Sequence, residues 1–226
     1  MKIALSGAQG VGKTTILNKM IEDPYFKNYE IRKEAMRNLV KEFNIGINKL
    51  GNNESQLLIA NAHYQNTFKG PQFITDRGLL DCFVFTTRMF QDKQIDQWVY
   101  DYNLQLLKSK ADEYDFVFYF PPEFDLVDDN FRSLDKNYQT ELHELFETII
   151  DKLKLKHIRY ITGTIEERYN KIKTIIRNNK DKNLFLKNNF NYNNRNRNSL
   201  FRSNNKFFNN KINNLFLKCK IGIYYN

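Results

Sequence analysis

Residues 7–14 read Gly7-Ala8-Gln9-Gly10-Val11-Gly12-Lys13-Thr14, directly after the apolar run Ile3-Ala4-Leu5. This stretch fits the pattern G-x-x-x-x-G-K-[ST], the phosphate-binding loop called Walker A. Its glycines let successive backbone amides turn inward and bind phosphate oxygens at the positive end of the following helix. The pattern needs a buried strand before it and a helix after it, and residues 1–6 and 14–22 are typical of both. The alternative is a glycine-rich turn that binds nothing.

The residue types of this loop predict which groups hold a nucleoside triphosphate and its metal ion. We expect Lys13 to reach the β and γ phosphates and the Thr14 hydroxyl to ligate Mg²⁺. The expected nucleotide contacts are Gly7, Ala8, Gln9, Gly10, Val11, Gly12, Lys13, Thr14 and Thr15. No short motif separates ATP from GTP, so the cofactor prediction is ATP or GTP with Mg²⁺.

The bulk composition predicts a cytoplasmic protein with one principal domain. A chain of 226 residues with 41% hydrophobic content can bury one full core. Cys82 and Cys219 are too few for a disulfide framework, and no apolar run approaches the length of a membrane span. Because the loop begins at Gly7, it leaves no room for a signal peptide before it.

The net charge of +9 lies in the C-terminal part of the chain. Residues 178–226 carry seven Lys, three Arg and one Asp, which leaves 25 basic and 25 acidic residues in 1–177. A neutral body argues against nucleic acid as its partner, whereas the basic tail is compatible with one. The sequence carries no signal for the oligomeric state.

Strand-like and helical stretches alternate along residues 1–177. Strands are expected at 1–6, 29–32, 72–77, 116–120 and 157–161, and helices at 14–22, 34–43, 54–68, 78–90, 94–110, 137–154 and 164–177. This alternation predicts an α/β fold of the P-loop NTPase type, a three-layer α/β/α arrangement with a mainly parallel sheet. Ligands of such folds bind at the carboxyl ends of the strands. By that rule the candidate ligand-binding positions are the phosphate loop, Glu34 after the second strand, and Asp76-Arg77 at the end of the third.

Asp76 and Arg77 are the first candidates for chemistry outside the loop. A carboxylate at this place can hold the Mg²⁺ shell through water, or accept the proton of a substrate hydroxyl. Arg77 can hold an anionic group of the acceptor. The alternative is an ordinary ion pair at a strand end, with Asp81 as the partner of Arg77.

Two further sites are predicted around the acceptor. Glu34 and Arg37 share a helix face and are expected to line an acceptor pocket; the alternative is a solvated surface pair. The polar connection 123–135 suits a lid, from which Arg132 would close on the transferring phosphates. The alternative there is an acidic surface loop.

From residue 178 onward the composition changes abruptly, with 17 Asn in 49 residues and no sustained period of 2 or 3.6. We expect two parts: a kinase-type domain at 1–177 and a tail at 178–226 that is disordered or not part of the fold. The tail is compatible with a basic nucleic-acid arm, an Asn-rich assembly segment, or the product of a shifted reading frame over A/T-rich codons.

Four segments together resemble one family: residues 3–15, 34–37, 75–81 and 121–133. The chain is similar to the P-loop kinase superfamily, on the thymidylate-kinase-like side, and within it to the NadR/Ttd14-like ATP-binding domains. The resemblance implies transfer of the γ-phosphate of ATP·Mg to a nucleoside, nucleotide or riboside, with Lys13, Asp76, Arg77 and Arg132 as catalytic residues. Two alternatives remain: a nucleotide-dependent regulatory switch and a polynucleotide 5′-kinase.

Overall fold

The computed structural model describes residues 1–33, 39–40, 42–43, 45–47, 50–68, 70–123, 136–182 and 184. The chain divides into two compact units, Met1–Ile172 and Lys173–Asn226. The predictions made for Glu34, Arg37 and Arg132, and for the tail beyond residue 184, therefore lie outside the described residues. A boundary between domain and tail after residue 177 stays a prediction.

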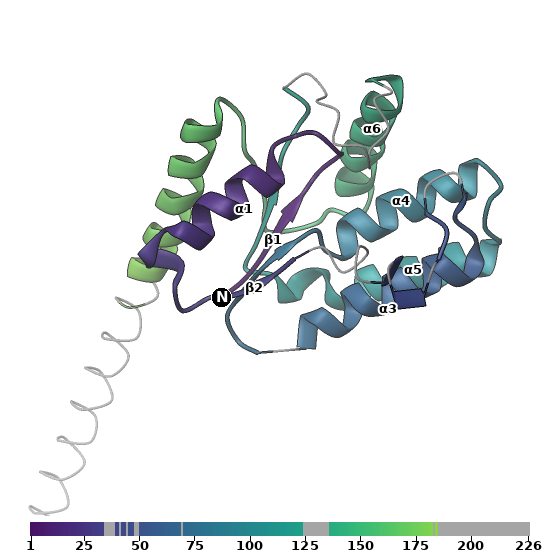
Figure 1. Ribbon diagram of the computed structural model, residues 1–226, viewed down its shortest axis with the longest axis horizontal. Coiled ribbons are helices and arrows are strands. Elements are labelled where there is room, and N and C mark those ends of the chain that lie inside the picture. The colour runs from purple at the N-terminus through teal and green to yellow at the C-terminus, as the bar shows by residue number, and fades with distance from the viewer. Residues whose placement is uncertain are drawn as a thin grey trace, which may run out of the picture. The chain divides into compact units, whose positions relative to one another are not determined.

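The first unit is built on a parallel sheet of five strands in the order β2-β3-β1-β4-β5 (Figure 1). The strands are β1 (Lys2–Ser6), β2 (Glu30–Arg32), β3 (Phe73–Asp76), β4 (Phe116–Tyr119) and β5 (Ile158–Tyr160). The three middle strands β3, β1 and β4 are almost entirely buried, as expected for a parallel sheet covered on both faces. Their side chains, Phe73, Leu5 and Phe118 among them, form the core of the unit.

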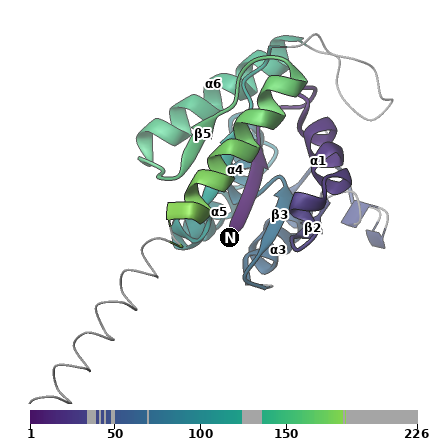
Figure 2. The same cartoon turned by 90° about the vertical axis from the view of Figure 1, so that its left-hand side faces the viewer.

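Helices cover both faces of this sheet. Their bounds are α1 (Lys13–Glu22), α3 (Asn53–Phe68), α4 (Leu79–Gln91), α5 (Gln97–Lys110) and α6 (Lys136–Lys152), with short 3₁₀ turns at Pro24–Phe26 and Ala111–Glu113. Figures 1 and 2 show α1 on one side of the sheet and α3, α4, α5 and α6 on the other. The predicted α/β/α architecture is confirmed. The last helix begins at residue 165 as expected but continues to 182, five residues further than the sequence predicted.

The strand register brings the predicted functional segments to one edge of the sheet. Leu5 of β1 lies opposite Asp76 of β3, and Ser6 lies opposite Tyr119 of β4. Since all five strands are parallel, the segments that follow them leave the sheet on the same side. Within the described ranges, no helix combines the length and apolar character that a bilayer crossing requires.

Cys82 lies on the buried side of α4, where its thiol donates to Oδ1 of Asn103 at 3.4 Å. Burial raises the pKa of this thiol to about 12. At pH 8 only about 10⁻⁴ of it is then ionised, and the thiolate is the reactive form. In a Cys219→Ser background we expect native protein to react with iodoacetamide more than roughly 1,000-fold slower than a free thiol. Protein unfolded in guanidinium should react fully; fast labelling of the native protein would contradict the buried position.

Candidate functional site

The phosphate loop connects β1 to α1 and has the backbone conformation that its glycines permit. Gly7 has φ of 144°, and a Cβ at this residue would lie 2.7 Å from the carbonyl oxygen of Phe120. Gly12, with φ of 86°, is the N-cap of α1. A side chain at Gly7 would therefore collide with the backbone after β4, so the loop can approach this closely only with glycine.

Lys13 points back into the loop that precedes it. Its side chain is buried, and Nζ donates to the carbonyl oxygens of Gly7 at 2.8 Å and Ala8 at 2.6 Å. The adjoining Thr14 and Thr15 are exposed in the first turn of α1, which contains no acidic residue. A lysine ammonium and an unneutralised helix N-terminus form a cradle for anions. These residues fit a phosphate group.

Asp76 and Arg77 stand where the register predicts, at the end of β3 beside β1. Asp76 is buried, and the backbone amide of Arg77 donates to the Leu5 carbonyl at 3.0 Å. Arg77 has φ of 69°, an uncommon conformation for a residue with a side chain. Its Nη1 lies 3.4 Å from the carbonyl oxygen of Gly7 and 3.5 Å from Oδ1 of Asp81. The ion pair with Asp81 that the alternative interpretation predicts is therefore present, and the same guanidinium also contacts the phosphate loop.

Asp81 is a central residue of this site that was considered above only as an ion-pair partner. It is 1% exposed, and it accepts from the Ser6 hydroxyl at 2.6 Å and the Gly7 amide at 3.0 Å. One signal for it was present in the sequence: it is the single acid in the run Leu79–Val84, which is otherwise apolar. A carboxylate can be buried on such a helix face only when several hydrogen-bond donors surround it.

Arg168 is the second residue that the sequence did not reveal. It is fully buried and donates to the carbonyl oxygens of Val11 at 2.8 Å and Gly163 at 2.7 Å, and to Oε2 of Glu123 at 2.5 Å. Glu123 also accepts from the amide of Gly163. Partial burial alone raises the pKa of Glu123, but hydrogen bonds from Arg168 and Gly163 outweigh it and hold the pKa below its usual value. Arg168 thus ties the phosphate loop to the segments that follow β4 and β5.

The N-terminal part of α6 also contacts the loop. Gln139 is buried, and its Nε2 donates to the carbonyl oxygen of Gln9 at 2.7 Å. The phosphate loop is consequently held by side chains from three helical segments: Asp81 of α4, Gln139 of α6 and Arg168 near the end of the first unit. In the described part of the chain, no group of three or more His, Cys, Asp or Glu side chains is arranged to hold a metal ion.

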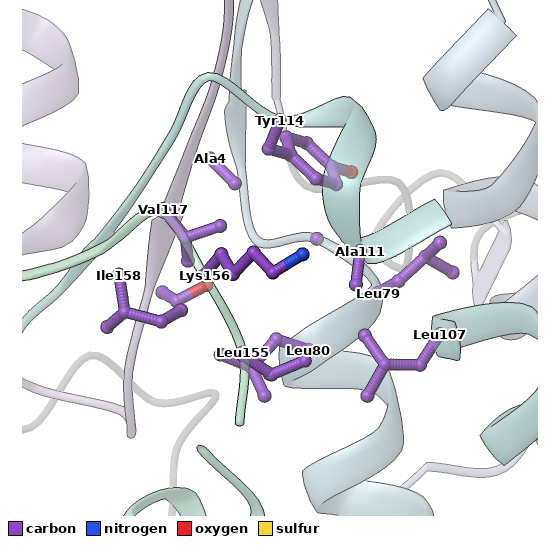
Figure 3. A pocket seen from close by; sticks show the side chains of 12 residues that line it. Ala4, Leu79, Leu80, Leu107, Ala111, Tyr114, Val117, Leu155, Lys156 and Ile158 are labelled. Atoms are coloured by element: carbon purple, nitrogen blue, oxygen red, sulfur yellow. The ribbon is translucent and has the colours of Figure 1, made fainter. Parts of the chain in front are cut away.

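A small cavity lies against β1, β4 and β5. Its volume is about 10 Å³, and Leu79, Leu107, Tyr114 and Lys156 are among its lining residues. Figure 3 shows mostly apolar side chains around it, with the Lys156 side chain extended among them. This volume suits at most a single water molecule, whereas nucleotide-sized ligands need several hundred Å³. The cavity is a packing gap too small for a nucleotide, although Ser6, which donates to Asp81, is among its lining residues.

The comparisons with known proteins agree with this geometry. A protein-family model described as "AAA domain" matches residues 2–168. No curated protein matches the chain. A crystal structure of the NadR protein in complex with NR has 18% identity and a TM-score of 0.59, covering 76% of this chain and 50% of that chain.

Two kinases have the same fold over nearly their whole length. Deoxyadenosine kinase from M. mycoides, with products dCMP and dCDP bound, has 18% identity and a TM-score of 0.56, covering 79% of this chain and 99% of that one. Thymidylate kinase from Candida albicans has 18% identity and a TM-score of 0.55, covering 79% of this chain and 91% of that one. The chain thus spans half of the NadR chain and almost all of either kinase.

The family model covers more than half of the chain, from β1 to Arg168. The structural neighbours share the fold of this chain, with TM-scores of 0.55 to 0.59. The chain therefore belongs to the AAA domain family, as the resemblance derived from the sequence implied, and it has an α/β P-loop NTPase fold that it shares with NadR, deoxyadenosine kinase and thymidylate kinase.

Proposed function

We propose that this protein transfers the γ-phosphate of ATP or GTP to a small nucleoside, nucleotide or riboside. One observation carries the proposal: Lys13 and Arg77 both donate to the carbonyl oxygen of Gly7, at 2.8 Å and 3.4 Å. Two cations so close together repel each other, and Arg77 also lies 3.5 Å from Oδ1 of Asp81. A phosphoryl group passing from donor to acceptor is the kind of anion that such a pair of cations stabilises.

The residues of the phosphate loop would hold the donor. The backbone amides of the loop after Gly7 and the Lys13 ammonium would bind its phosphate oxygens, while Asp81 holds the Gly7 amide itself. The exposed hydroxyl of Thr14 is available to a metal ion, and Thr15 follows it in the same turn. Mg²⁺, when bound, would offset the charge of the phosphates.

The residues after β3 would act on the acceptor. Asp76 would accept the proton of the acceptor hydroxyl or hold a water of the metal shell, and Arg77 would bind an anionic group of the acceptor or the phosphoryl group in transfer. Glu34 and Arg37 are proposed for the acceptor pocket, and Arg132 for a lid that closes on the phosphates.

The similar proteins support a nucleoside-type acceptor. The NadR structure contains NR, the deoxyadenosine kinase structure contains dCMP, and the third neighbour is a thymidylate kinase. At 18% identity these proteins share the fold with this chain, and the choice of acceptor is our proposal. The neutral charge of residues 1–177 is a further reason to favour a small acceptor over a polynucleotide.

One transfer assay tests the proposal. The full chain is incubated with γ-labelled ATP or GTP, Mg²⁺, and a panel of nucleosides, nucleoside monophosphates, nicotinamide riboside and 5′-hydroxyl oligonucleotides. We expect label in at least one small acceptor. Label only in an oligonucleotide would make the protein a polynucleotide kinase. Triphosphate binding without transfer to any acceptor would favour a nucleotide-dependent switch, and absence of binding would refute the site altogether.

A further inference from the structure

We propose that Asp81 is the positioning residue that fixes the start of the phosphate loop and Arg77 as one unit. The carboxylate lies in the first turn of α4 and is shielded from solvent. Its Oδ1 accepts from the Gly7 amide at 3.0 Å and lies 3.5 Å from Nη1 of Arg77. Its Oδ2 accepts from the Ser6 hydroxyl at 2.6 Å and the Gly78 amide at 3.3 Å. The four donors come from the end of β1, the loop, and the turn between β3 and α4.

These contacts require a carboxylate. An ionised Asp has about four acceptor positions and no donor, which matches the four donors around Asp81. An Asn in its place would turn an NH₂ group toward two of them. The Ser6 hydroxyl can reverse and accept, but the amides of Gly7 and Gly78 cannot. At least one buried donor would then lose its partner in either orientation of the Asn.

One residue, Gly7, links the two halves of the site. Asp81 holds the Gly7 amide, while the Gly7 carbonyl accepts from Lys13 and Arg77. Asp81 therefore fixes the first glycine of the loop and, through Arg77, the cation proposed for the acceptor side. A residue that couples these two positions sets the distance between donor and acceptor, to which phosphoryl transfer is sensitive. This last step rests on the function proposed above.

The test compares Asp81→Asn with Asp92→Asn. Asp92, the C-cap of the same helix, pairs with Arg88 at the same i,i+4 spacing, but it is exposed and far from the loop in sequence. In ligand-free protein, hydrogen exchange of the peptide containing Ser6 and Gly7 should become faster in Asp81→Asn only. The Kd for a fluorescent nucleoside triphosphate should rise about tenfold or more in Asp81→Asn, and less than about twofold in Asp92→Asn.

A double-mutant cycle separates positioning from a general loss of structure. We expect Arg77→Ala to lower kcat/KM about 100-fold in the wild type, but less than about fivefold in the Asp81→Asn background, because Arg77 is already displaced there. Additive effects, or an Asp81→Asn variant that behaves like Asp92→Asn, would overturn the inference. If the wild type binds triphosphate but transfers it to no acceptor, the proposed function fails, while exchange and Kd still test Asp81.

Ser6→Ala serves as the milder variant if Asp81→Asn does not fold. It deletes one donor to Asp81 and leaves the carboxylate in place. We expect faster exchange at Gly7 and a Kd about threefold higher than in the wild type. An unchanged exchange rate and Kd in Ser6→Ala would count against the positioning role.

Discussion

Lys13→Ala is expected to abolish detectable phosphoryl transfer and to weaken triphosphate binding about 10²–10³-fold. The ammonium of Lys13 is the charged donor inside the phosphate loop, and alanine cannot replace its contacts with phosphate oxygens. Isothermal titration with a nucleoside triphosphate and the labelled-transfer assay measure the two effects.

The fold should survive this substitution because other side chains hold the loop. Asp81 bonds to the Gly7 amide, Gln139 to the Gln9 carbonyl and Arg168 to the Val11 carbonyl. Lys19→Ala is the matched control, since Lys19 lies on the same helix and pairs with Glu166 at the surface. This control substitution should change the Kd for the nucleoside triphosphate less than about twofold. Normal turnover in Lys13→Ala would refute the assignment of the loop.

Arg168→Met is expected to cost about 3–5 kcal/mol in free energy of unfolding, a large part of the stability of an ordinary domain. Methionine keeps much of the apolar length but removes every donor. The carbonyl oxygens of Val11, Gly163 and Pro121 and the carboxylate of Glu123 would all lose the guanidinium. Urea denaturation of the two proteins at 25 °C measures the difference.

Arg159→Met provides the control for this prediction. Arg159 is exposed on β5, and its Nη1 donates to the carbonyl oxygen of the preceding residue, Ile158. Its replacement should cost less than about 1 kcal/mol. Arg168→Lys should recover only part of the loss, since a single ammonium cannot reach the acceptors that a guanidinium spans. A cost below about 1 kcal/mol for Arg168→Met would show that the buried contacts contribute little.

The features that the sequence predicted correctly are those with a local pattern. The loop at Gly7–Thr14 has a fixed spacing, and the strand at Phe116–Tyr119 is a continuous apolar run. Each pattern specifies its own structure before any tertiary contact forms. The position of Asp76-Arg77 beside the loop followed from one general rule, that parallel strands present their carboxyl ends together.

The features that the sequence did not reveal depend on contacts between distant segments. Arg168 follows two glutamates at the start of a helix, which is typical of a solvated surface, yet it is buried against the loop 157 residues away. Exposure likewise depends on tertiary contacts: Trp98 is 54% exposed, because α5 buries Val99, Asn103 and Leu107 instead.

The central position of β1 has a consequence for the order in which the molecule is completed during synthesis. β1 is synthesised before its two neighbours, β3 and β4, and the amide of Phe120 donates to the carbonyl of Ser6 at 2.9 Å. A nascent chain that ends before Phe120 therefore lacks the backbone segment that packs against Ser6 and Gly7. Until then Ile3-Ala4-Leu5 can pair only with β3 and keeps one strand edge open to aggregation or to chaperones. Although its sequence is made before those of β3 and β4, the phosphate loop is among the last parts of the domain to acquire its shape.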